Sequence, residues 1–201
     1  MRLGILGGTF DPVHYAHLAI AEEARVQLGL ERVIFVPAGQ PPHKLGEVIT
    51  PVHYRLTMLE LALASNPHFL ISRVDLERPG PSYTVDTLAL IQERWGPGAE
   101  LYFIIGADSL LGMHSWHHPE RIIEAAQLAV VPRLGNSIHL PELEKELPGL
   151  SQKVTMIQAP LLEISGTDLR RRVREGRSIK YYVPEEVEAY IFKHGLYQGG
   201  E

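Results

Sequence analysis

The most informative absence in this 201-residue sequence is cysteine, of which it has none. Disulfide bonds, thiolate catalysis and cysteine-based zinc or iron–sulfur sites are thereby excluded. A basic excess is missing too: 19 Lys and Arg stand against 24 Asp and Glu, and the formal net charge is −5. This charge balance argues against broad electrostatic binding to nucleic acid or to an anionic membrane.

Long hydrophobic runs are also lacking, since no stretch approaches the roughly 20 apolar residues of a membrane-spanning helix. The N-terminal MRLGILGGTF has neither the basic region nor the long apolar region of a secretion signal. We therefore expect a soluble, cytoplasmic protein without a membrane partner. Because 45% of the residues are apolar and 21% are charged, we expect a buried core rather than disorder.

Strand-like and helix-like segments alternate along the chain. Apolar runs rich in β-branched and aromatic residues predict strands at 2–6, 32–36, 69–74, 101–105, 127–131 and 153–157. Helical periodicity predicts helices at 16–28, 53–65, 84–95 and 109–126, with loops at 38–50 and 133–148. Such alternation is typical of right-handed βαβ units. The expected fold is therefore α/β, a doubly wound Rossmann-like parallel sheet.

Two further helices, at 165–175 and 184–194, are predicted after the last strand. They would form a small C-terminal helical extension of the sheet domain. We expect a single domain over residues 1–201, with a core at about 1–160 and a C-terminal helical part at about 161–201.

Ligands of doubly wound sheets bind beyond the carboxyl ends of the strands, and the first strand ends in GGTFDPVHYAHL, residues 7–18. Gly7 and Gly8 allow backbone N–H groups to approach a ligand closely, and the helix that follows directs its positive end towards it. His14 and His17 project from about the same side and can donate hydrogen bonds to phosphate oxygens. Half of a metal site is the alternative, but Asp11 is the only nearby third ligand. The pattern favours phosphate binding.

A second candidate phosphate site is ISGTDLR, residues 164–170. Ser165 is a predicted helix N-cap, the following N–H groups would face an anion, and Arg170 can fork onto phosphate oxygens. Six basic and two acidic residues lie between Ser165 and Lys180, so an RNA-binding patch or a solvated helix face are alternatives. The additional arginines expected at the surface are Arg171, Arg172 and Arg174.

The two motifs together resemble those of the nucleotidyltransferase superfamily, whose second motif is Ile-Ser-Ser-Thr-x-x-Arg. Gly166 replaces the second serine of that motif. One hydroxyl that the family offers to phosphate is therefore missing, although the glycine N–H remains. Because a helix start accepts serine well, we expect Gly166→Ser to be tolerated.

Three more segments resemble bacterial nicotinate-nucleotide adenylyltransferases: PPHK at 41–44, PSYTVDT at 81–87, and IIGAD at 104–108 followed by Trp116. The resemblance spans residues 4–170. It implies that the partners are ATP and nicotinate mononucleotide and that the products are deamido-NAD and pyrophosphate, a step of NAD biosynthesis. It also implies Mg²⁺ held mainly by the ATP phosphates, with no protein metal ligand and no nucleic-acid partner. A homo-oligomer is left open.

Site residues are carried over from the resemblance by matching motif positions. The catalytic candidates are His14, His17 and Arg170. The ATP-binding candidates are Gly7, Gly8, Thr9, Phe10, Gly106, Asp108, Ser165 and Thr167. The acceptor-binding candidates are Lys44, Thr84 and Trp116.

Two other functions stay open at this point. One is a sibling adenylyltransferase with a different phosphate acceptor, either nicotinamide mononucleotide or phosphopantetheine. The other is a catalytically inactive, nucleotide-binding regulatory module, against which the intact His-x-x-His and Arg170 argue.

Overall fold

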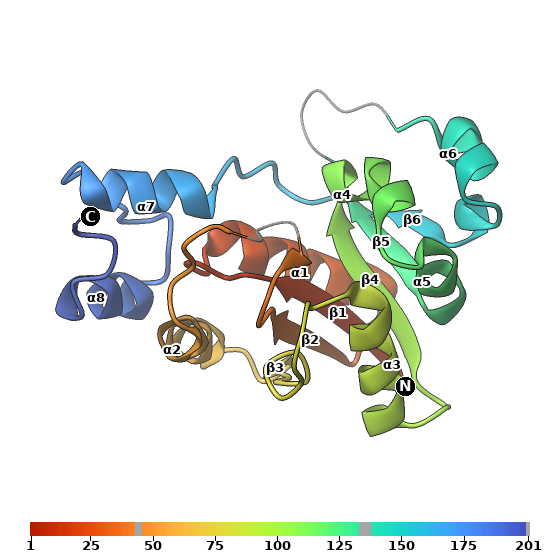
Figure 1. The fold of residues 1–201 in the computed structure, drawn as a ribbon, viewed down its shortest axis with the longest axis horizontal. Coiled ribbons are helices and arrows are strands. Elements are labelled where there is room, and N and C mark those ends of the chain that lie inside the picture. The colour runs from red at the N-terminus through yellow and green to blue at the C-terminus, as the bar shows by residue number, and fades with distance from the viewer. Residues whose placement is uncertain (43–45, 133–137, 200–201) are drawn as a thin grey trace.

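The computed structural model describes residues 1–42, 46–132 and 138–199, and in this part of the chain a six-stranded parallel sheet forms the centre of the fold (Figure 1). The strands are β1 (Arg2–Gly8), β2 (Arg32–Pro37), β3 (Phe69–Ile71), β4 (Glu100–Gly106), β5 (Gln127–Val131) and β6 (Val154–Met156). Their order is β3-β2-β1-β4-β5-β6, and every neighbouring pair is parallel. The predicted doubly wound α/β fold is confirmed.

The strand order places the switch point of the sheet between β1 and β4. The chain passes from β1 outward to β2 and β3, then returns to add β4, β5 and β6 on the other side. The inner strands are runs of consecutive buried residues, as expected for strands covered on both faces. The edge strands β3 and β6 have three residues each and are shorter than predicted. A ligand is therefore expected beyond the carboxyl ends of β1 and β4.

Helices cover both faces of the sheet (Figure 1). The α-helices are α1 (Tyr15–Leu28), α2 (Val52–Leu63), α3 (Thr84–Trp95), α4 (Ala107–Leu111), α5 (Pro119–Ala125), α6 (Leu140–Glu146), α7 (Gly166–Arg174) and α8 (Glu185–Lys193). Two 3₁₀ turns, η2 (Met113–Ser115) and η3 (Leu150–Gln152), complete the described elements. None of the described helices is long and apolar enough to cross a lipid bilayer.

Each face of the sheet has its own apolar core. On one face Leu6 is buried with residues of α1, α2, α7 and α8. On the other face Leu3 and Ile5 are buried with residues of α3, α5 and α6. The two C-terminal helices thus share a core with helices from the N-terminal third of the chain, and α8 packs against α2. This shared core is the reason we propose one domain rather than two.

Two helix predictions need correction. The helix expected over 109–126 is divided into α4, η2 and α5, because His118 adopts a left-handed φ of 52° and Pro119 starts a new helix. The loop expected over 133–148 contains α6, which buries Leu143 against the sheet. Of that predicted loop, residues 133–137 lie outside the described residues.

Candidate functional site

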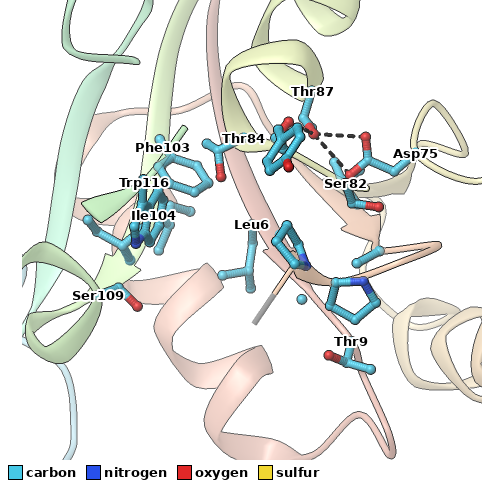
Figure 2. Close-up of a pocket in the computed structure, with 18 of the residues that line it drawn as sticks. Leu6, Thr9, Asp75, Ser82, Thr84, Thr87, Phe103, Ile104, Ser109 and Trp116 are labelled. Carbon is cyan, nitrogen blue, oxygen red and sulfur yellow. Dashed lines mark hydrogen bonds between the residues drawn. The ribbon is translucent and has the colours of Figure 1, made fainter. Parts of the chain in front are cut away.

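Two cavities adjoin each other at the carboxyl edge of the sheet. The first, of about 540 Å³, is bounded by the β1 turn, the loop after β2, the start of α3 and the end of β4 (Figure 2). The second, of about 770 Å³, is bounded by the start of α1, the end of β4 and residues 160–166. Four residues line both cavities, namely His17, Ile20, Gly106 and Ser109. The two cavities therefore meet beside His17.

The glycines at this edge keep the backbone open to a ligand. A Cβ atom at Gly106 would have no heavy atom within 4 Å, and one at Gly7 would meet only the Phe103 ring, at 3.9 Å. A side chain at either position would consequently project into the space beside the strand ends. Gly7, Gly8 and Thr9 line the first cavity, whereas Gly106 lines both.

His17 is held in one tautomer by its neighbour. The backbone N–H of His14 donates to Nδ1 of His17 at 3.2 Å, so this nitrogen is unprotonated and Nε2 carries the hydrogen of the neutral ring. The His14 ring stacks on His17 with centroids 3.7 Å apart, and the Phe10 ring meets it edge-on at 5.1 Å. Burial, and secondarily the adjacent His14, hold the pKa of His17 well below its usual range. At neutral pH His17 is an uncharged hydrogen-bond donor.

Phe10 lies in the core, although it was expected among the ATP-binding residues. Its ring is 1% exposed and packs against Phe35 and His17, and its side chain lines neither cavity. It also has a left-handed φ of 50°, a conformation that a bulky residue adopts only where its surroundings hold it. We assign the Phe10 ring to the support of His17.

Arg55 is the buried side chain that holds this turn, and the sequence had given no indication of it. It is 1% exposed, and it donates to the carbonyl of Thr9 at 2.7 Å and to that of Thr50 at 2.9 Å. Burial lowers the pKa of Arg55 from its ordinary value, while Asp11 acts in the opposite direction. An arginine on an amphipathic helix is normally expected at the surface, which is why the pattern did not single it out.

The second motif, residues 164–170, contacts the first motif, residues 7–18, through Arg170. Arg170 of α7 donates from Nη1 to the backbone carbonyl of Asp11 at 2.7 Å, and from Nη2 to the hydroxyl of Thr167 at 3.4 Å. Ser165 takes the predicted N-cap position, but its hydroxyl makes no capping hydrogen bond. Ser165 and Gly166 line the second cavity, and the side chains of Thr167 and Arg170 lie outside its lining.

The structure contradicts the expectation that Gly166→Ser is tolerated. A Cβ atom at position 166 would lie 2.8 Å from the carbonyl oxygen of Asp11, far inside van der Waals contact. A side chain at this position would therefore force the backbone of α7 and the turn after β1 to move apart. The requirement for glycine is thus set by this close approach, which no local sequence pattern reveals.

Two of the arginines expected at the surface, Arg171 and Arg172, make contacts within the C-terminal helical part. Asp168 pairs with both Arg171 and Arg172, and the Arg172 guanidinium lies over the Tyr182 ring at 4.7 Å. These contacts fit the expectation of a solvated helix face better than that of a free RNA-binding patch.

Two of the three predicted acceptor residues, Thr84 and Trp116, line the first cavity. Thr84 is the first residue of α3, and Trp116 packs against Phe103 with ring centroids 6.1 Å apart. Figure 2 shows Trp116 and Phe103 on one wall, and Asp75 and Ser82 on the opposite side. Lys44 lies outside the described residues. Asp108, expected on the ATP side, lines the second cavity.

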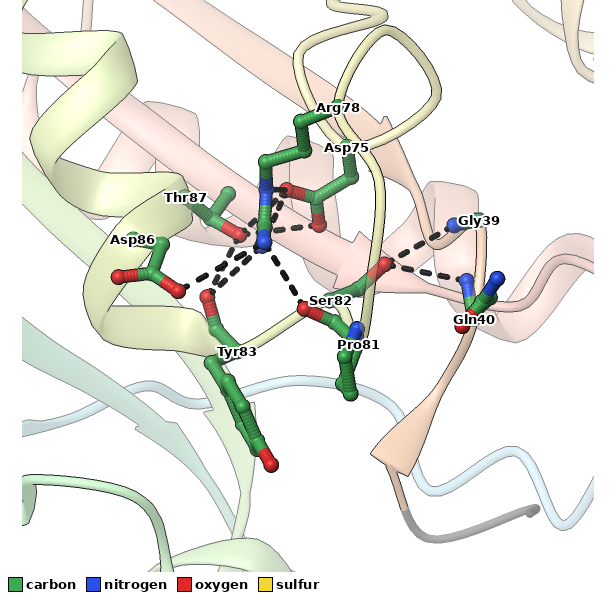
Figure 3. Close-up of polar contacts among 9 residues, drawn as sticks. All are labelled: Gly39, Gln40, Asp75, Arg78, Pro81, Ser82, Tyr83, Asp86 and Thr87. Carbon is green, nitrogen blue, oxygen red and sulfur yellow. Dashed lines mark hydrogen bonds and ion pairs between the residues drawn. The ribbon is translucent and has the colours of Figure 1, made fainter.

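A network of polar contacts that sequence reasoning missed supports the wall opposite Trp116 (Figure 3). Asp75 is 5% exposed and lies 2.8 and 2.9 Å from the hydroxyl of Thr87. Arg78 donates to Asp75 at 3.1 Å and to the carbonyl of Pro81 at 2.8 Å. Burial raises the pKa of the Asp75 carboxyl, although the hydrogen bonds from Thr87 and Arg78 oppose this.

Ser82 ties this wall to the loop after β2. Its hydroxyl oxygen accepts the backbone N–H groups of Gly39 at 3.0 Å and of Gln40 at 3.3 Å. Gly39 is itself required, because a Cβ there would lie 2.6 Å from the carbonyl of Asp75. The two segments that line the first cavity are consequently joined by short contacts. Among the described residues, no three His, Asp or Glu side chains are grouped so as to bind a metal ion.

Comparison with known proteins identifies the family. The model of the cytidylyltransferase-like family matches residues 5–172. Proteins named probable nicotinate-nucleotide adenylyltransferase from Thermomicrobium roseum and Roseiflexus sp. are 52% and 50% identical, over 98% of this chain and 92% and 98% of their own lengths.

Solved structures agree at the level of the fold. The nicotinic acid mononucleotide adenylyltransferase of Plasmodium falciparum, complexed with NaAD, superimposes with a TM-score of 0.80 at 23% identity over 99% of this chain and 98% of its own. The same enzyme complexed with APC gives a TM-score of 0.77. The chain therefore belongs to the cytidylyltransferase-like family and, within it, to the nicotinate-nucleotide adenylyltransferases.

Proposed function

We propose that this protein transfers the adenylyl group of ATP to nicotinate mononucleotide, producing deamido-NAD and pyrophosphate. The observation that carries the proposal is the position of His17 at the junction of two cavities. The second cavity would hold ATP and the first would hold the acceptor. The α-phosphate and the attacking phosphate would then meet beside the Nε2–H of His17.

The state of His17 suits this chemistry. The acceptor nucleophile is a phosphate whose second pKa is about 6, so it is largely dianionic at neutral pH and needs no general base. The protein has to position two anions and stabilise the charge on the α-phosphate and on the leaving pyrophosphate. An uncharged donor with a fixed tautomer can do so without reorganising during the reaction.

On the ATP side, we assign the carboxylate of Asp108, which lines the second cavity, to the ribose hydroxyls, by analogy with acidic residues in other dinucleotide folds. The N-terminus of α7 at Ser165 and Gly166 opens onto the second cavity. Arg170 has five N–H donors, more than its two contacts with Asp11 and Thr167 use. We assign the α7 N-terminus and Arg170 to the triphosphate, and we propose that Mg²⁺ enters bound mainly to the phosphates.

On the acceptor side, the start of α3 at Thr84 offers backbone N–H groups and a positive helix end to the carboxylate of nicotinate. Trp116 offers a ring on which the pyridine can stack. An amide in place of the carboxylate would direct its NH₂ at these donors, a mismatch that costs about 1–3 kcal/mol per unsatisfied group. We therefore propose a preference for nicotinate over nicotinamide mononucleotide of at least about 10²-fold in kcat/KM.

The test is pyrophosphate release from ATP and Mg²⁺ with each of three acceptors: nicotinate mononucleotide, nicotinamide mononucleotide and phosphopantetheine. We expect rapid release with the first and formation of a product of the mass of deamido-NAD. Equal consumption of the two pyridine mononucleotides in competition would overturn the acceptor assignment but not adenylyl transfer. Binding of ATP without turnover of any acceptor would instead identify a regulatory module.

A further inference from the structure

Asp11 belongs to the turn after β1, yet the proposed chemistry does not use its carboxylate. This side chain is 6% exposed. Its Oδ1 accepts the hydroxyl of Tyr197 at 2.6 Å, and its Oδ2 accepts the backbone N–H of Thr50 at 3.2 Å. The backbone carbonyl of the same residue accepts Arg170. Asp11 is thus the point at which the β1 turn, the loop before α2, α7 and the C-terminal segment meet.

Left-handed backbone lies at Tyr197 and at the residue before Asp11. Phe10, which precedes Asp11, has a φ of 50°, and Tyr197 has a φ of 65°. Left-handed backbone is costly for a bulky residue and persists only where the surroundings over-determine it. The surroundings therefore constrain the backbone at Tyr197 and beside Asp11, where the two side chains meet.

The Tyr197 side chain is placed as a donor. Its ring packs against the core that α2, α7 and α8 share. Burial and the neighbouring Asp11 carboxylate raise the pKa of Tyr197 far above its ordinary value. The hydroxyl therefore stays protonated at neutral pH and donates to Asp11.

We propose that Tyr197 is a positioning residue for adenylyl transfer. By anchoring the Asp11 side chain, its hydroxyl restrains the residue whose backbone carbonyl binds Arg170, the arginine that we assign to the triphosphate. The inference rests on the proposed function, since it takes the assignment of Arg170 to ATP from there. Tyr197 itself contacts neither cavity.

The variant that tests this is Tyr197→Phe, which removes one hydroxyl and keeps the ring. We expect kcat/KM for ATP to fall by about tenfold, on the scale of one lost hydrogen bond to a charged group. The KM for nicotinate mononucleotide should change much less. Tyr181→Phe is the matched control, because Tyr181 also has a left-handed φ, 66°, but is 83% exposed. We expect it to behave as the parent protein does.

A double-mutant cycle separates positioning from general stabilisation. If Tyr197 acts through Arg170, then Tyr197→Phe should cost less than about twofold in an Arg170→Ala background. Additive losses would overturn the inference, as would an unchanged kcat/KM for ATP in Tyr197→Phe. All assays are run below the thermal unfolding midpoint of each variant, so that a loss of folded protein is not counted as a loss of activity.

A second variant covers the case in which Tyr197→Phe does not fold. Asp11→Asn keeps an acceptor for Tyr197 but directs an NH₂ group at a backbone N–H or at the hydroxyl, and the same cycle with Arg170→Ala applies to it. If the parent protein releases pyrophosphate and the cycle is additive, only this inference fails. If the parent protein releases none with any acceptor, the proposed function fails.

Discussion

At the scale of single residues, His17 has one hydrogen-bonding role available at neutral pH. Its Nδ1 accepts the amide hydrogen of His14, and burial together with His14 lowers its pKa. Only the Nε2–H group then remains to contact a ligand. This assignment leads to two separate predictions, one for catalysis and one for stability.

His17→Ala should lower kcat by roughly 10²-fold or more, the cost of losing one preorganised donor at the reacting phosphate. We expect little loss of stability, and the thermal unfolding midpoint measures this directly. His53→Ala, at an exposed position near the start of α2, is the control. Unchanged turnover in purified His17→Ala would remove this histidine from the mechanism.

The lowered pKa of His17 makes stability depend on pH. Below 6.5, the ordinary value, the unfolded chain protonates this site more readily than the folded chain does. The free energy of unfolding therefore falls as the pH is lowered through the window between 6.5 and the lower folded pKa. His17→Gln lacks this site and should lose less stability than the parent between about pH 7.5 and pH 5. Parallel unfolding curves for both proteins would contradict the lowered pKa.

Gly166→Ser should be impaired, in contrast to the expectation from sequence. The added Cβ would clash with the Asp11 carbonyl, and forced overpacking of this kind costs about 1–3 kcal/mol. The turn and α7 must separate, so we expect a higher KM for ATP together with a lower unfolding midpoint. Gly98→Ser is the matched control, since a Cβ at Gly98 meets no atom within 4 Å. Full activity of Gly166→Ser would show that the turn can yield.

At the scale of elements, the wall of the first cavity that lies opposite Trp116 depends on contacts between loops rather than on helix packing. Ser82 alone links the segment before α3 to two backbone N–H groups after β2. Arg78 pairs with Asp75 and donates to the carbonyl of Pro81 in the same segment (Figure 3). The shape of the first cavity should therefore respond to a small change in this wall.

Ser82→Ala should raise the KM for nicotinate mononucleotide by about tenfold, because two N–H groups lose their acceptor and the wall loosens. The KM for ATP should stay nearly constant, since Ser82 lines only the first cavity. Steady-state kinetics with each substrate varied in turn measures the difference. Ser65→Ala, at an exposed site at the end of α2, controls for the loss of a hydroxyl. An equal rise in both KM values would argue against two separate substrate sites.

At the scale of the whole molecule, the two cavities lie on either side of His17 and should be separable by mutation. Trp116→Ala should weaken both pyridine mononucleotides together by about 1 kcal/mol or more, because stacking does not distinguish acid from amide. Asp108→Asn should raise the KM for ATP and leave that for the acceptor nearly unchanged. Binding titrations of each variant with ATP and with each mononucleotide measure these effects. If Trp116→Ala weakened ATP and Asp108→Asn weakened the acceptor, the two cavities would have to exchange their assigned substrates.

The sequence was sufficient to predict the parallel sheet and the turn after the first strand with its two glycines and two histidines, because both depend on local periodicity and on motifs within a few residues. It could not predict Arg55, Tyr197 or Asp75 as parts of the site. Arg55 and Tyr197 bind partners 46 and 186 residues away, and Asp75 is buried against a helix that follows it. The break at His118 has a signal in the sequence, because Pro119 is disfavoured inside a helix and begins α5 instead. The Asp11–Gly166 approach is a purely tertiary constraint.

The contacts of Asp11 with Arg170 and Tyr197 can form only late in the synthesis of the chain. The two contacts close 159 and 186 residues of chain. At about 5–20 residues per second, Tyr197 is added roughly 10–40 s after Asp11. During that interval Arg55 can already hold the histidine-bearing turn, but Asp11 has neither Arg170 nor Tyr197 to bind until the end of the chain is made. A ribosome-bound chain that ends before α8 should consequently contain both phosphate-binding motifs, residues 7–18 and 164–170, and still transfer no adenylyl group.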